Sequence, residues 1–378
     1  MRLLFIVFAA AMCCGAQAAV PPPVATLDRG SWPERLSSPA LFDVASRAEI
    51  LSFAHELRLS EALDGPALAE RLGLRQVNVD QVNSLRQRLW QRLWENFDHA
   101  QKSCEQDASF CYAVDDLPML RQEALAFKID EDSFYTHWAE PARAFNRTYL
   151  DELLRMAALF PHISSEIERF SGIEHNGDEL NDRVFLLSFD GGPTLAQGQT
   201  DWVTDYLRRQ RLTAIFFTLG NSVQLRRDNA PQDDLEALYR NQCVGVQGWQ
   251  YRSHSQWVDW QQSVQRSVAL VQSQVPENYV PLFRPPYGQR KADSQSFFEA
   301  QQLQVMLWDI DSMDNNVAVS AAQAADRVIS LMLLWRKGVI VFHDTQDKVK
   351  IALPAVFEQT LESGIGWEEC REFPALLD

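Results

Sequence analysis

The sequence carries little positive charge for its length. Its 378 residues include 35 Lys and Arg against 51 Asp and Glu, which gives a formal net charge of -16. Such a field repels phosphate backbones unless a local basic stripe overrides it, and the sequence has no such stripe. The charge balance therefore argues against nucleic acid as a partner. The composition, 46% hydrophobic and 23% charged, argues against disorder and fibrous repeats, and the length allows two or three domains.

Long apolar runs are also scarce. Beyond the N-terminus the best run, Val328 to Trp335, is far shorter than the ~20 residues of a spanning helix, so no transmembrane segment is predicted. The N-terminus itself has the form of an export signal, with Arg2, an apolar run from residue 3 to 14, and the small-x-small sequence Ala16-Gln17-Ala18. We expect residues 1–18 to be a signal peptide and the mature protein to be periplasmic or secreted.

Few cysteines remain beyond the expected cleavage site, and none form a C-x-x-C pair, which argues against a structural zinc site. In an oxidising compartment four cysteines favour disulfides, with three possible pairings. A bridge between Cys104 and Cys111 is favoured because it closes a short loop, while four buried free thiols are the alternative. The four are Cys104, Cys111, Cys243 and Cys370.

The first half of the chain carries helical signals from residue 46 to about 170. One apolar stripe at helical spacing follows Asp80, which is expected to cap the helix, and a second stops before Pro161. The stripes could bind a partner, but the core of a helical bundle is their commoner meaning. We expect an α-helical domain over residues 19–175. The stripes are Val82, Leu85, Leu89, Leu93 and Phe97, and Ala142, Phe145, Tyr149, Leu153 and Met156.

The second half, residues 183–378, alternates short apolar runs with helix-length polar segments. This alternation predicts an α/β fold with a parallel sheet or barrel, whose chemistry gathers at the carboxyl ends of the strands. The expected strands are 184–189, 214–219, 244–247, 305–308 and 339–342. The expected helices are 200–211, 233–242, 260–274, 292–302 and 319–335.

Polar clusters follow successive predicted strands. The first begins with Asp190 in a Asp-Gly-Gly-Pro turn, and taken alone this aspartate is equally consistent with an Asx-type turn. The others are the segments 248–254, 283–288, 308–314 and 339–344.

In this order the clusters resemble the motifs of the NodB-homology polysaccharide deacetylases, carbohydrate esterase family 4. Residues 188–193 resemble T-F-D-D-G-P, residues 284–287 match R-x-P-Y, residues 311–314 match D-x-x-D-W with Asn315 in place of Trp, and residues 341–343 match the last motif. The resemblance covers residues 183 to 370. It implies a distorted (β/α) barrel of the polysaccharide-deacetylase type, preceded by the α-helical domain.

The resemblance also implies a divalent metal, usually zinc, held by an aspartate and two histidines. Gly191 stands at the aspartate position and Gln250 at that of the first histidine, while His254 matches the second. A glycine offers no ligand, and a glutamine carbonyl is a weak one for zinc. We therefore expect no metal or weakly bound zinc, with His254 as a remnant, unless a distant residue replaces the missing ligands. A lone histidine is more often a hydrogen-bonded pocket residue than a ligand.

The acid–base residues of the family are present. The resemblance implies that Asp190 is the general base, held ionised by Arg284, and that His343 is the general acid that protonates the leaving amine. Asp311 would orient the ring of His343, and backbone N–H groups near Tyr287 would bind the oxyanion. The alternative is that these pairs are ion pairs kept as scaffold.

Aromatic residues near the motifs suggest a sugar ligand. Tyr287, Trp249 and Trp308 are candidate substrate-binding residues, because exposed rings stack on sugar faces, although large apolar residues at a barrel rim more often pack.

The sequence supports three candidate functions. The first is metal-dependent deacetylation of N-acetylated sugars in a wall or secreted polysaccharide such as peptidoglycan. The second is glycan binding by a degenerate relative, and the third is a scaffold whose helical half contacts an unknown protein partner.

Overall fold

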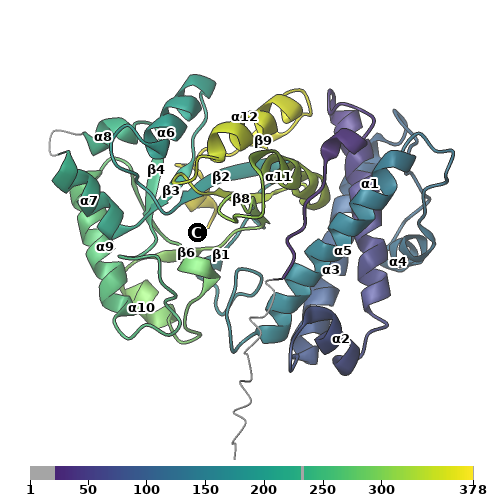
Figure 1. Ribbon diagram of the computed structural model, residues 1–378, viewed down its shortest axis with the longest axis horizontal. Helices are drawn as coiled ribbons and strands as arrows, with labels where there is room; N and C mark the ends of the chain where they lie inside the picture. The colour runs from purple at the N-terminus through teal and green to yellow at the C-terminus, as the bar shows by residue number, and fades with distance from the viewer. Residues whose placement is uncertain (1–21, 231–233, 378) are drawn as a thin grey trace, which may run out of the picture.

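The computed structural model describes residues 22–230 and 234–377, so the predicted signal peptide, residues 1–18, lies outside the described residues. A group of long helices stands beside a curled sheet that is surrounded by its own helices (Figure 1). The predicted class, a distorted (β/α) barrel preceded by an α-helical part, is confirmed.

The helical region buries the two predicted stripes against each other. Leu93, Phe97 and Ala142 are fully buried, so the stripes form the core of a bundle rather than an open surface. The predicted cap is wrong: Asn78 caps the helix by accepting a hydrogen bond from the N–H of Gln81 at 3.2 Å, because a capping side chain must precede the first turn. The elements are η1 (Arg29–Ser31), α1 (Pro39–Ser60), α2 (Gly65–Leu72), α3 (Val79–Ala100), η2 (Gln101–Ser103), α4 (Leu117–Ala126) and α5 (Thr136–Leu159).

The sheet of the described residues is parallel throughout, with the order β1-β6-β5-β4-β3-β2-β8-β7 and with β9 added beside β2. Its central strands are buried along their whole length, as continuous apolar runs require. The sheet begins before residue 183, where the sequence predicts the barrel domain to start, because β1 already belongs to it. The strands are β1 (Glu174–His175), β2 (Val184–Asp190), β3 (Ile215–Thr218), β4 (Cys243–Val246), β5 (Tyr279–Phe283), β6 (Gln304–Met306), β7 (Ile310–Asp311), β8 (Gly338–Phe342) and β9 (Gly366–Trp367).

Helices follow most strands of the sheet. In place of the predicted helix 233–242 the structure has the shorter α8. Two helices were not predicted from the sequence. The first, α7, is polar and buries Val223 as its one branched apolar side chain, and the second, α12, contains Pro354. The helices are α6 (Gln199–Gln210), α7 (Gly220–Asn229), α8 (Leu235–Leu238), α9 (Trp260–Gln274), α10 (Gln295–Ala300), α11 (Ala321–Trp335) and α12 (Val349–Thr360), with 3-10 turns η3 (Pro286–Gly288) and η4 (Phe373–Leu376).

The curled sheet ends at β1 on one side and at β7 on the other. Asp309 bridges this seam, because its Oδ2 accepts hydrogen bonds from the backbone N–H groups of Gly177 and Val339, both at 2.8 Å. Its Oδ1 pairs with Arg92 of α3 at 3.2 Å. The helical region is therefore attached where the barrel is open, and α1 also packs along α11.

Two disulfides are present among the described residues. The predicted bridge between Cys104 and Cys111 is confirmed, and Cys243 of β4 pairs with Cys370 near the C-terminus. None of the described helices combines the length and the apolar character that crossing a membrane requires.

Candidate active site

The first component of the site is a buried ion pair at the carboxyl ends of β2 and β5. Arg284 Nη1 donates to Asp190 Oδ1 at 2.9 Å and to the hydroxyl of Ser188 at 2.7 Å. The other guanidinium N–H groups donate to the carbonyls of Met306 and Leu307. Burial lowers the pKa of Arg284 and the charge of Asp190 opposes this, so the carboxylate is held by a fully engaged cation.

Gln247 is a second partner of Asp190 that the sequence analysis missed. It directly follows β4, and its Nε2 donates to Asp190 Oδ2 at 2.6 Å. Its own Oε1 is buried without a hydrogen-bond partner among the described residues. Each oxygen of Asp190 thus accepts one hydrogen bond from the protein, and the side chain has a fixed orientation.

The turn after Asp190 needs its two glycines for different reasons. Gly191 has a φ of +93°, a conformation that favours glycine, whereas Gly192 leaves no room for a Cβ because the carboxylate of Asp344 lies against it. Burial raises the pKa of Asp344 to about 7, and Thr200 donates to its Oδ2 at 2.8 Å. The turn is therefore packed on a buried acid.

His343 follows β8, the neighbour of β2, and the register of Phe189 with Phe342 brings it beside Asp190. The prediction that Asp311 orients the ring is wrong. Asp314 does so, with its Oδ1 accepting from Nδ1 at 2.7 Å and its Oδ2 accepting from the backbone N–H of His343 at 3.0 Å. Met313, which lies between the two acids, has a positive φ of 54°, and the second acid, not the first, contacts the ring.

The amide of Asn315 occupies the other ring nitrogen of His343. Its Nδ2 lies 3.2 Å from Nε2. A neutral ring accepts this hydrogen bond, whereas a protonated ring donates to the amide oxygen after the amide turns over. Asn315 is exposed, so a ligand can displace it from the ring.

The electrostatic surroundings favour the protonated ring. Burial alone would lower the pKa of His343, but the hydrogen bond and charge of Asp314, with the charges of Asp190 and Asp311, raise that pKa to about 9. Near neutral pH the ring is therefore a cation with one N–H facing the site.

Asp311 lies at the end of β7, close enough to act on His343 through its charge. Its Oδ1 accepts from the backbone N–H of Met313 at 2.8 Å, and its carbonyl accepts from Arg327 at 2.8 Å. Burial raises the pKa of Asp311, and the charge of His343 opposes this. Its catalytic role stays a prediction.

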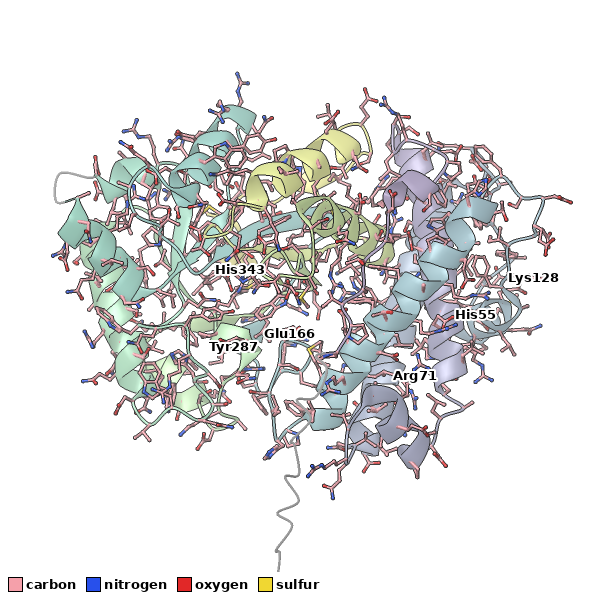
Figure 2. The ribbon with its side chains drawn as sticks, viewed as in Figure 1. His55, Arg71, Lys128, Glu166, Tyr287 and His343 are labelled. Carbon is pink, nitrogen blue, oxygen red and sulfur yellow. A yellow bond between two sulfur atoms is a disulfide. The ribbon has the colours of Figure 1, made fainter. Side chains whose placement is uncertain are left out.

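Aromatic residues differ in how open they are. Tyr287 has a φ of 60°, is 52% exposed and meets Tyr251 edge to face at 4.7 Å. Figure 2 shows Tyr287 near His343 in the middle of the molecule. The ring of Trp249 is covered by Arg266, 3.8 Å from its centroid, while Trp308 is partly exposed. Sugar binding by these rings, and by the backbone near Tyr287, stays a prediction.

The residues at the predicted metal positions do not fit a zinc ion. Both ring nitrogens of His254 are engaged, Nδ1 with the carbonyl of Arg252 at 2.8 Å and Nε2 with the hydroxyl of Ser263 at 3.2 Å. Burial lowers the pKa of His254 to about 4, so the ring is neutral and packed. Gly191 offers no ligand, and Gln250 is exposed. Within residues 22–230 and 234–377, no group of three or more His, Cys, Asp or Glu side chains could hold a metal.

Comparison with known proteins identifies relatives of the barrel. Residues 177–306 match the model of the polysaccharide deacetylase family. A bifunctional xylanase/xylan deacetylase from Cellvibrio japonicus is 29% identical over 165 residues, which cover 42% of this chain and 22% of that protein. This chain thus matches only about a fifth of the length of that relative.

Solved structures also resemble this chain. A pseudoenzyme of carbohydrate esterase family 4 from Bacillus anthracis has a TM-score of 0.46 at 18% identity, covering 55% of this chain and 70% of that one. A peptidoglycan deacetylase from Bacillus subtilis has a TM-score of 0.43 at 22% identity, covering 52% of this chain and 92% of that one.

Proposed function

Because residues 177–306 belong to the polysaccharide deacetylase family, we propose that this chain binds N-acetylated sugars of a wall or secreted polysaccharide, such as peptidoglycan, without metal-dependent hydrolysis. The observation that carries this proposal is the state of His254, the one predicted metal ligand that remains. Its Nδ1 contacts the carbonyl of Arg252, which a metal-bound histidine can also do, but the hydroxyl of Ser263 occupies Nε2. Gly191 and exposed Gln250 supply no further good ligand, so the set of about three protein ligands that a zinc site needs is not assembled.

The polar groups beside this position suit an N-acetylated sugar. Asp190 can accept further hydrogen bonds from sugar hydroxyl or amide N–H groups, because a carboxylate has about four acceptor sites and the protein uses two. Protonated His343 can donate from Nε2 to an acetyl carbonyl once Asn315 moves aside. The exposed ring of Tyr287 offers a face for stacking. Binding of this kind needs no metal.

Metal-dependent deacetylation is the second candidate, favoured by the family and by the presence of Asp190 and His343. It requires a metal with about three protein ligands and an open position for water. The alternative that the helical half is a protein-binding scaffold has less support, because its apolar stripes are buried.

We also propose that the protein is exported. The N-terminal sequence predicts a signal peptide over residues 1–18, and two disulfides, Cys104–Cys111 and Cys243–Cys370, suit an oxidising compartment. Mass spectrometry of the secreted or periplasmic protein tests this, since cleavage before Ala19 is expected.

Calorimetric titration with N-acetylglucosamine oligomers tests the binding proposal. Asp190→Asn and His343→Gln should each weaken binding by about tenfold, because each removes a charge-assisted hydrogen bond. Asp205, an exposed residue of α6 that pairs with Arg208, lies away from the site, so Asp205→Asn makes the same charge change there and should bind like the unchanged protein. Equal affinities for Asp190→Asn and Asp205→Asn, with both proteins folded, would contradict the proposal.

A further inference from the structure

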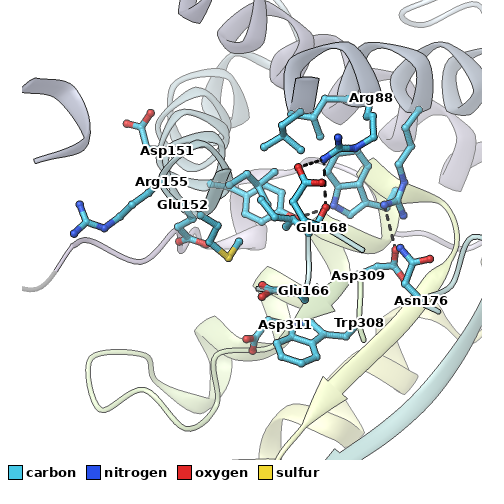
Figure 3. Close-up of a pocket in the computed structure, with 18 of the residues that line it drawn as sticks. Arg88, Asp151, Glu152, Arg155, Glu166, Glu168, Asn176, Trp308, Asp309 and Asp311 are labelled. Atoms are coloured by element: carbon cyan, nitrogen blue, oxygen red, sulfur yellow. Dashed lines mark hydrogen bonds and ion pairs between the residues drawn. The ribbon is translucent and has the colours of Figure 1, made fainter. Parts of the chain in front are cut away.

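A cavity of about 910 Å³ lies between the helical region and the barrel, at the seam where the sheet is open. Helices α3 and α5 form one wall, and the segment from Trp308 to Met313 forms the other (Figure 3). This volume is in the range of small-molecule binding sites in proteins. The cavity is built by both halves of the chain and is separate from the turn at Asp190.

Most charged side chains around the cavity already have partners. Arg88 pairs with Glu168, Arg92 with Asp309 at 3.2 Å, and Arg327 with Glu152 at 2.7 Å. Arg71 of α2 pairs with Asp151 at 2.8 Å. These side chains neutralise one another and leave the walls nearly balanced.

Glu166 and Asp311 differ from these pairs. Figure 3 shows their carboxylates facing the same space, with Trp308 beside them. Among the described residues neither makes an ion pair, since the cations around them have other partners: Arg290 binds Glu174, Arg327 binds Glu152 and His343 binds Asp314. Two carboxylates brought together without a cation disfavour each other's charge.

The pKa values agree with this geometry. Burial raises the pKa of Glu166 to about 7, and the negative charge of Asp311 adds to this while Arg290 opposes it. Burial also raises the pKa of Asp311. A bound cation between the two groups would relieve the cost of ionising both.

Trp308 gives the cavity a second kind of recognition. Its ring is partly exposed in the cavity lining. The side chains of Leu89, Met156 and Met313 add apolar surface. An indole face beside two carboxylates suits a ligand that combines a flat C–H surface with a positive charge.

We propose that this cavity binds an amino sugar with a free protonated amine, its ammonium group between Glu166 and Asp311 and its ring against Trp308. The inference deepens the proposed function and rests on it for the identity of the polymer, because a free amine occurs wherever a unit of that polysaccharide has lost its acetyl group. A small peptide or polyamine would supply the charge, but it would not supply a pyranose face for contact with the Trp308 ring.

The cavity and the candidate active site share one loop. Asp311 and Met313 line the cavity, while Asp314 and Asn315 hold the ring of His343. A chain with one acetylated and one free amino sugar could therefore occupy both sites. We expect partly deacetylated oligomers to bind more tightly than oligomers of either pure kind.

Calorimetry with glucosamine oligomers and N-acetylglucosamine oligomers of equal length tests the inference. Glu166→Gln should weaken binding of the glucosamine oligomer by about tenfold or more and leave the acetylated oligomer unchanged, because only the ammonium group needs the second carboxylate. Asp311→Asn should weaken binding of the glucosamine oligomer as well, but it also removes a charge that raises the pKa of His343, so only Glu166→Gln is expected to leave the acetylated oligomer unchanged. Glu140→Gln, which removes an exposed charge of α5 outside the cavity lining, is the matched control and should leave both affinities unchanged.

The pH dependence provides a further check. Glu166 is faced by Asp311 from β7, Glu152 from α5, Arg290 from the segment after η3 and Arg327 from α11. Because its pKa is about 7, binding of the protonated amine should strengthen as the pH rises through 7 and weaken again once the ligand's amine deprotonates. Glu166→Gln should flatten the rise.

Three results would overturn the inference. These are an equal loss of affinity for glucosamine and N-acetylglucosamine oligomers in Glu166→Gln, an unchanged affinity of Glu166→Gln for the glucosamine oligomer, and equal binding of spermidine, which has charge but no sugar ring. Failure of the proposed function would give a different result. The N-acetylglucosamine oligomer would then either not bind, or bind equally well to the unchanged protein and to Asp190→Asn.

Discussion

Asp314 holds His343 through two hydrogen bonds, one to the ring Nδ1 at 2.7 Å and one to the backbone N–H at 3.0 Å. The Asp314 side chain is fully buried and that of His343 is 10% exposed. This double contact fixes both the rotamer and the charge of the ring, which makes His343 a preorganised hydrogen-bond donor at the carboxyl end of β8.

Asp314→Asn should lower the pKa of His343 from about 9 to near or below its ordinary value of 6.5, because burial then acts without the opposing carboxylate. A histidine titration followed by NMR measures this. Asp311→Asn, which removes a more distant charge, should lower that pKa less. An equal effect of the two variants would contradict the assignment of Asp314 as the partner.

The same pair makes stability depend on pH. The pKa of His343 in the folded protein, about 9, lies above the 6.5 expected for the unfolded chain, so its stabilisation is complete below pH 6.5 and is lost as the pH rises through 9. Urea unfolding at both ends of this range should show the loss in the unchanged protein. Asp314→Asn should be less stable at low pH and should show a smaller loss.

Arg284→Met should destabilise the fold by about 3–5 kcal/mol, because it leaves Asp190 buried without its cation. Denaturant unfolding measures the change. Arg209→Met on the exposed side of α6 is the control and should change the free energy of unfolding little. A similar small effect for Arg284→Met would show that the pair contributes little to stability.

The two disulfides should differ in their contributions. Removing Cys243–Cys370, with a sequence separation of 127, should cost about 5 kcal/mol on chain entropy, against about 2 kcal/mol for Cys104–Cys111 with a separation of 7. Unfolding of the two paired Cys→Ala variants tests this order. The reverse order would indicate that the unfolded chain is not the main source of their stabilisation.

Rebuilding the predicted metal positions should fail without further changes. Gly191→Asp places a side chain at a φ of +93° and should cost about 1–2 kcal/mol. With Gln250→His added, His254 would still have both nitrogens hydrogen-bonded, so zinc affinity should rise only weakly. Equilibrium dialysis measures the affinity. One tightly bound zinc per chain in the double variant would show that His254 can turn toward a metal.

Residues that a single short segment positions could be predicted from the sequence. Asp190 and His343 each follow an apolar run, and the adjacency of β2 and β8 brings them together as expected for parallel strands. The choice between Asp311 and Asp314 depends on the left-handed turn at Met313, which the motif does not reveal. No sequence motif around Glu166 points to a functional role. It lies beside Asp311 only because the helical region packs against the barrel.

The same limit applies to Asp190 itself. Arg284 was predicted as its partner from a family motif, whereas Gln247 was missed because glutamine after a strand is a common surface residue. The opening of the sheet between β1 and β7 could not be predicted either. Asp309 bridges it by contacting Gly177 and Val339, and these three residues lie in segments that are far apart in the sequence.

Binding and acetate release measured in one sample, with N-acetylglucosamine oligomers and the purified protein, with and without added zinc, test most directly whether the protein binds the glycan without hydrolysing it. We expect saturable binding that Asp190→Asn weakens, no acetate release, and no effect of zinc or chelator on affinity. Acetate release by the unchanged protein that zinc stimulates and a chelator abolishes would contradict this expectation.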